Sequence, residues 1–195
     1  MCNISFKGYL DSCWDTVHSR AFKPKTIISL CGAHLSEQFS EALRDQQVRP
    51  ECKVTYQLLF AKMQQARNLT ELSRLFNTMC DLALAKDEPQ LPDLNDATAA
   101  TVAVSEDTAP KEDEPEQADS TYRTDTPFGK HFDKVVREAK MRNAPDSQAR
   151  CSNIYLCPGL PDYIAYFIMP LAPLWSQLVS DVPTTNAVAE SHFTS

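Results

Sequence analysis

The sequence predicts a mostly α-helical chain with one minor β element. Three observations support this fold class: apolar residues recur at helical spacing in most segments, one short β-branched run interrupts them, and a long acidic stretch carries almost no large apolar side chains. At 195 residues the chain is long enough for a sizeable core and a tail. We therefore expect a helical body divided by one polar segment.

The first helix is expected over residues 5–20. Its apolar face is formed by Phe6, Tyr9, Leu10, Cys13, Trp14 and Val17. A face this apolar needs a sheet or other helices to cover it. Because it begins almost at Met1, we expect the chain to start inside a larger domain.

A strand is expected next, over residues 25–31. Ile27 and Ile28 favour an extended backbone, and Gly32 then lets the chain turn. From His34 to Leu43 the apolar spacing changes to that of a helix. Residues 24–43 therefore predict one buried strand that leads through a polar junction into a helix.

Two further helices are expected to form an antiparallel hairpin. The first spans residues 52–66. Asn68 can cap the second, because its side chain can accept a backbone amide bond while Glu71 supplies the reciprocal bond. Only a short polar turn separates the two helices, which favours direct packing of one against the other.

The chain is expected to divide into three parts. Residues 1–85 form the helix–strand–helix unit and the hairpin, residues 86–122 form a disordered acidic linker, and residues 123–195 form a C-terminal helical part. Residues 86–119 hold eleven acidic side chains and two lysines, whereas the whole chain has a net charge of −7. The linker is thus strongly acidic and the remainder is nearly neutral, which offers little attraction for nucleic acid.

The C-terminal part is expected to begin with a helix at Pro127, since proline is favoured in a first helical turn. Residues 163–169 and 174–179 read as two core helices separated by prolines. This apolar window is too short and too interrupted to predict a membrane span. A last helix is expected to start near Pro183 and to carry Glu190.

The seven cysteines follow no disulfide spacing, and no signal peptide precedes them. This pattern predicts a reducing compartment, so we expect the protein in the nucleus or the cytoplasm and not in a membrane.

Three stretches, taken in order, resemble the distal half of the catalytic domain of Mutator-like and related DDE transposases. They are residues 24–34 with the pair Cys31-x-x-His34, residues 155–160 followed by 168–176, and the Thr-Asn-x-x-x-Glu block of residues 185–190. The resemblance implies part of a ribonuclease-H-like α/β core with a helical insertion. It also implies a transposon-derived animal protein that is truncated.

In the intact parent, the resemblance implies Mg²⁺-dependent cleavage and transfer of DNA strands. Such chemistry needs about three carboxylates around two metal ions. Only the third is visible here, as Glu190. We therefore expect a fragment or domesticated remnant that is catalytically inactive alone and binds DNA weakly or not at all.

A zinc site is a second interpretation of the polar junction. Cys31 and His34 have usable ligand spacing, and Cys151 with Cys157 would complete a set of four. The alternative is that Cys31 packs as a small apolar residue and His34 bonds to a backbone carbonyl. No other cofactor is indicated.

Two functions of other classes therefore stand beside the transposase remnant. One is a helical protein-interaction module whose acidic segment recruits a partner. It predicts helices that close on themselves and bury Trp14, Phe39 and Trp175 without any extra strand. The other is a small zinc-binding module.

Overall fold

The computed structural model describes residues 6–19, 28–87, 125–144 and 152–179. Within these ranges the chain forms α-helices and one short 3₁₀ helix. Their bounds are α1 Phe6–Ser19, α2 Gly32–Asp45, α3 Pro50–Gln64, α4 Leu69–Leu84, α6 Pro127–Arg142, α7 Gly159–Phe167, η1 Met169–Leu171 and α8 Ala172–Trp175. The last predicted helix, with Glu190, lies outside the described residues.

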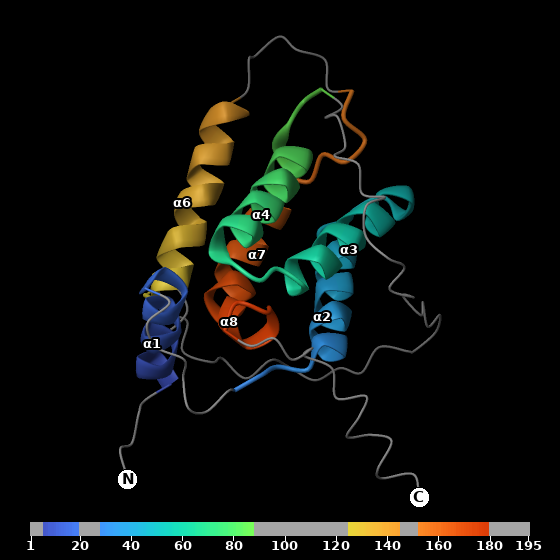
Figure 1. Ribbon diagram of the computed structural model, residues 1–195. Helices are drawn as coiled ribbons and strands as arrows, with labels where there is room; N and C mark the ends of the chain where they lie inside the picture. Colours follow the sequence, from blue (N-terminus) through green and yellow to red (C-terminus); the bar gives the residue numbers. More distant parts are fainter. Residues whose placement is uncertain (1–5, 20–27, 88–124, 145–151, 180–195) are drawn as a thin grey trace, which may run out of the picture.

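Helix α4 is central among the longer helices (Figure 1). It packs against α3 on one side and α6 on the other, and α7 contacts both α4 and α6. Helix α2 pairs with α3, and α1 contacts α6. The two parts of the chain on either side of the acidic segment therefore share one hydrophobic core.

Aromatic side chains join the two parts in the core. Phe39 of α2 stacks on Phe60 of α3 with ring centroids 4.2 Å apart, and Phe60 contacts Trp175 of α8 at 5.6 Å. Phe76 of α4 meets Phe132 of α6 edge to face. Such pairs contribute beyond the apolar area that they bury, so residues from both halves stabilise the same core.

The expectation of a partial ribonuclease-H-like α/β core is wrong for the described residues, which contain no strand or sheet. Of the predicted strand at residues 25–31, positions 25–27 lie outside the described ranges, and positions 28–31 are extended without pairing. The amide of Leu30 donates instead to the carbonyl of Leu174, 2.7 Å away. Ile28 is 41% exposed. The amide of Ile28 donates to the hydroxyl of Tyr9 on α1. This segment therefore bonds to helices α8 and α1 instead of to a neighbouring strand.

Two predicted helix starts are confirmed. Asn68 caps α4 by accepting the amide of Glu71 at 2.8 Å, and Pro127 opens α6 behind Thr126, whose hydroxyl accepts the amide of Gly129. The Glu71 carboxylate accepts from the amide of Arg67, one residue before the cap. The predicted helix at residues 174–179 is wrong, because α8 already ends at Trp175.

The segment of residues 152–158 is the main irregular element of the core. Asn153 is buried and donates its side-chain amide to the carbonyls of Leu82 and Ala85, at the end of α4. The hydroxyl of Tyr56 donates to the carbonyl of Tyr155 at 2.6 Å. The two Asn153 bonds satisfy carbonyls at the end of α4 that lack intrahelical partners, and the Tyr56 bond ties the segment to α3. The segment therefore fixes where α7 begins relative to α4.

No described helix is both long enough and apolar enough to cross a membrane.

Candidate functional site

Among the residues that the structure describes, the predicted zinc ligands do not form part of a metal-binding cluster. Cys31 is the half-buried residue that precedes α2, and His34 is exposed in the first turn of that helix. Among the described residues, no cluster of three or more His, Cys, Asp or Glu side chains could hold a metal ion. Cys151 and Glu190 lie outside the described residues, so the four-ligand set and the catalytic carboxylate stay predictions.

The described thiols lie in apolar surroundings. Cys157 is buried, and its thiol donates to the carbonyl of Gln46. Burial raises the pKa of Cys157, and it also raises the pKa of Cys52, Cys13 and Cys80. A thiol kept protonated is neither a good metal ligand nor a good nucleophile. These cysteines therefore act as small core residues.

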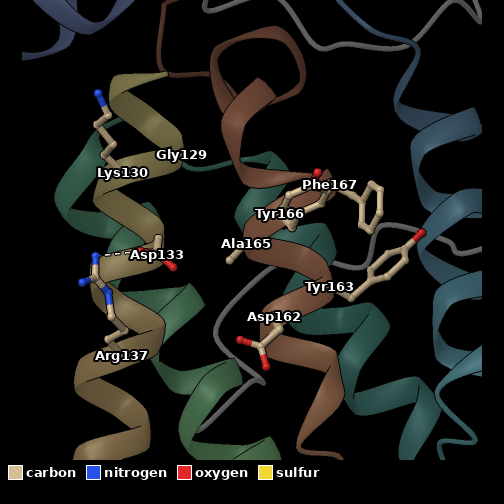
Figure 2. Close-up of a pocket in the computed structure, with 9 residues that line it drawn as sticks. All are labelled: Gly129, Lys130, Asp133, Arg137, Asp162, Tyr163, Ala165, Tyr166 and Phe167. Atoms are coloured by element: carbon tan, nitrogen blue, oxygen red, sulfur yellow. Dashed lines mark ion pairs between the residues drawn. The ribbon is translucent and has the colours of Figure 1, made fainter. Parts of the chain in front are cut away.

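A groove between α6 and α7 is the candidate functional site (Figure 2). Its volume is about 500 Å³. We call it the α6–α7 groove and define it by its lining residues: Gly129, Lys130, Asp133, Arg137, Asp162, Tyr163, Ala165, Tyr166 and Phe167.

The floor of the groove is made of small residues. Gly129 of α6 and Ala165 of α7 are both buried. In Figure 2 Ala165 points from α7 toward α6, across from Asp133. Because neither residue has a long side chain, the two helices leave space above them at the surface.

The wall on α6 carries both signs of charge. Arg137 pairs with Asp133 at 2.6 Å, and Lys130 pairs with Asp125 at 2.7 Å. Both carboxylate oxygens of Asp162, on α7, accept a hydrogen bond from Nζ of Lys140 at 2.7 Å. These pairs are exposed, and exposed pairs are worth roughly 0–1 kcal/mol each. A bound ligand can therefore replace these ion pairs with pairs to its own charged groups at little cost in free energy.

The aromatic side chains of α7 form the other edge. The rings of Tyr163 and Phe167 have centroids 4.8 Å apart, and Tyr166 meets Phe167 edge to face at 4.7 Å. Figure 2 shows Tyr163 and Phe167 on the side of α7 that faces away from α6. Phe167 is 41% exposed. The groove is thus bordered by an apolar, aromatic shoulder.

Sequence reasoning missed this site because it assigned residues 163–169 to a core helix. Ile164 is fully buried, whereas Tyr163 and Tyr166 are half-buried and Phe167 is exposed. Aromatic residues at positions i, i+3 and i+4 of a short helix were the available signal. Which face of that helix would be covered depends on the packing of α4 and α6, which the local pattern does not contain.

Comparison of the chain with protein-family models, with curated proteins and with solved structures finds no match. The resemblance to Mutator-like transposases therefore stays a prediction from its motifs. The function has to be argued from the geometry of the described helices.

Proposed function

We propose that this chain is a helical protein-binding module that takes a short extended segment of a partner protein into the α6–α7 groove. The arrangement of the core supports this choice among the three alternatives. Phe39 and Trp175 are buried in a core that contains no strand among the described residues, and Trp14 is half-buried against Phe128 of α6. This packing favours a helical module.

One observation carries the proposal: the aromatic side chains of α7 remain at the surface beside a groove, while the core aromatics are almost completely covered. Partly exposed tyrosine and phenylalanine rings are typical of protein-binding surfaces, because they offer large contact area at low cost in conformational entropy. Here Tyr163, Tyr166 and Phe167 supply that area.

The dimensions of the groove limit the size of the bound segment. Lys130 and Arg137, which line the wall on α6, are separated by two helical turns, or roughly 10 Å. An extended chain advances about 3.3 Å per residue, so the groove accommodates about three to four residues. An interface this small leaves little free energy after the cost of association. We expect dissociation constants in roughly the micromolar to millimolar range.

The charges favour a peptide over nucleic acid. The carboxylates of Asp133 and Asp162 lie in the lining of the groove, where they repel phosphate groups. A peptide can place an apolar side chain on the aromatic shoulder and pair its own charges with both Arg137 and Asp133. The acidic recruiting segment of residues 86–122 remains a prediction from composition, since only Lys86 and Asp87 of it are described.

The test is selection of random seven-residue peptides, displayed in many copies per phage, on the full chain. Selected peptides are then synthesised with a fluorescent label, and binding is measured by anisotropy. We expect Phe167→Ala and Arg137→Glu each to weaken binding at least tenfold, because they remove the aromatic contact and reverse a charge of the wall.

Two matched controls lie on other helices. Leu58 of α3 is 39% exposed, close to the 41% of Phe167. Arg44 of α2 pairs with Glu41 on its own helix and its side chain is 62% exposed, against 64% for Arg137. Leu58→Ala and Arg44→Glu should change binding less than twofold. The proposal fails if no peptide is selected, or if the groove substitutions leave the dissociation constant of the selected peptides unchanged.

A further inference from the structure

A cluster of imidazole and aromatic side chains joins α1 to the rest of the molecule. His131 of α6 lies with its Nε2 2.8 Å from the hydroxyl of Ser73 on α4. The indole of Trp14, on α1, has its centroid 5.6 Å from the His131 ring and meets Phe128 edge to face at 4.9 Å. Three helices therefore meet at one half-buried histidine.

A second imidazole reaches the same indole from α1 itself. The ring of His18 lies 4.2 Å from Trp14, and its Nδ1 is 2.9 Å from the carbonyl of Trp14. The indole of Trp14 thus has one imidazole from each of the two helices beside it. Neither ring has a role in the α6–α7 groove.

We propose that α1 is a pH-sensitive clasp, which is released from α6 on mild acidification while the other helices stay folded. The release follows from protonation of His131 beside Trp14. It exposes the faces of Phe128 and Trp14 that cover each other at neutral pH.

The charges around His131 set the direction of the effect. Burial, His18 and Lys134 lower the pKa of His131, while Glu138 raises it; the facing group on α4 is Ser73, a neutral hydroxyl. The docked form therefore binds a proton less readily than the released form, in which the imidazole meets water. As the pH falls below the ordinary value of 6.5, the equilibrium shifts toward release.

Other contacts explain why α1 is released before the remaining helices. Besides the cluster, α1 buries Tyr9, Leu10 and Cys13 in the core, and it is held by the exposed pair Lys7–Asp125 and by the hydroxyl of Tyr9, which accepts the amide of Ile28. Among the described helices, however, α1 packs mainly on α6, whereas α4 packs on α3, α6 and α7. Helices α4 and α6 are joined by packed core aromatics and by a network around Asp81. Local opening follows the weakest set of contacts, and protonation weakens those of α1 first.

Hydrogen–deuterium exchange with mass spectrometry tests the proposal on the full chain. Exchange of peptides covering residues 6–19 is measured at pH 7.5 and pH 5.5 and corrected for the known pH dependence of chemical exchange. We expect the opening constant of α1 to rise at least about threefold. Peptides from α4, residues 69–84, should change less than 1.5-fold, roughly the precision of the corrected comparison.

His131→Gln cannot titrate but can still bond to Ser73, so it should abolish the rise. His34→Gln on α2 is the matched control, because His34 is exposed in its helix, and it should leave the rise intact. The proposal is overturned if the opening constant of α1 does not change between the two pH values, or if that of α4 rises equally. It is also overturned if the opening constant of α1 rises as much in His131→Gln as in the unsubstituted chain. If that variant unfolds at pH 7.5, the ring protons of His131 are titrated by NMR in the unsubstituted chain; a pKa at or above 6.5 overturns the proposal equally.

Discussion

Replacing Asn153 with alanine is expected to lower the free energy of unfolding by about 2 to 4 kcal/mol. The side chain is 5% exposed. Its Nδ2 donates to the carbonyl of Leu82 at 2.8 Å and to that of Ala85 at 2.7 Å, and its Oδ1 accepts the amide of Tyr155 at 2.9 Å. Alanine removes all three bonds and leaves their partners in a mostly buried place.

The magnitude follows from those three bonds. Each hydrogen bond contributes about 1 kcal/mol net, and each buried partner left unsatisfied costs about 1–3 kcal/mol. The three lost bonds sum to about 3 kcal/mol. Water entering the vacated space would satisfy the partners left behind, which keeps the expected loss near that sum, at about 2 to 4 kcal/mol. For a domain of this size the loss corresponds to a fall in Tm of roughly 5 to 15 °C.

Urea unfolding followed by far-UV circular dichroism at pH 7 measures the loss. Asn153→Asp keeps the size and the acceptor but replaces the donor, so it should destabilise at least as much as alanine. Asn143→Ala is the control. Asn143 also donates to two acceptors, but it is only half-buried, so its removal should cost about 1 kcal/mol. A loss below about 1 kcal/mol in Asn153→Ala, or full stability in Asn153→Asp, would refute this role for Asn153.

Four further outcomes are expected. Gln47→Gly should raise the free energy of unfolding by about 0.5–1 kcal/mol in the same assay, because Gln47 follows the C-terminal cap of α2 with φ of 55°; a loss of stability would contradict this. The two lysines beside Asp125 hold the pKa of this carboxyl at about 2. The stabilising effect of these two ion pairs should therefore be present above pH 4 and fade as the pH falls toward 2. An NMR titration in which the signals of Asp125 and the two lysines do not change over this pH range would exclude the effect. Purified chain should contain far less than one zinc ion by elemental analysis, and Cys31→Ser with His34→Ala should leave Tm unchanged. Supercoiled DNA should stay intact with Mg²⁺; nicking that is lost in Glu190→Gln would reverse this expectation.

Local chemistry explains which elements could be predicted from the sequence. The start of α4 was predictable because Asn68 and Glu71 make their capping bonds within one turn of the helix. The start of α6 was predictable because Pro127 fits only a first helical turn. Both signals act over a few residues and need no knowledge of the fold.

The predicted strand failed for a reason that lies elsewhere in the chain. A β-branched run such as Ile27–Ile28 favours an extended backbone, and the described part of it is extended. Whether extended chain becomes a strand depends on a partner, and the bond from Leu30 goes to Leu174, far away in sequence. The ribonuclease-H-like core was implied by the resemblance of three stretches, of which this run is part of the first, and the described residues contain no sheet.

The candidate site required tertiary information in the same way. The aromatic residues of α7 follow a pattern that fits a buried helix, and Ile164 is buried as that pattern predicts. Phe167 remains exposed because α4 and α6 cover only the opposite face. Likewise, Asn153 could not be identified as a capping residue, since the carbonyls that it caps precede it by about seventy positions.

The most direct test of the proposed module is to map a selected peptide on the ¹⁵N-labelled full chain by NMR. Binding in the α6–α7 groove predicts that amide shifts concentrate at residues 129–137 and 162–167, with little change on α2 and α3. Shifts concentrated on α2 and α3, or spread evenly over the helices, would contradict the proposed binding surface.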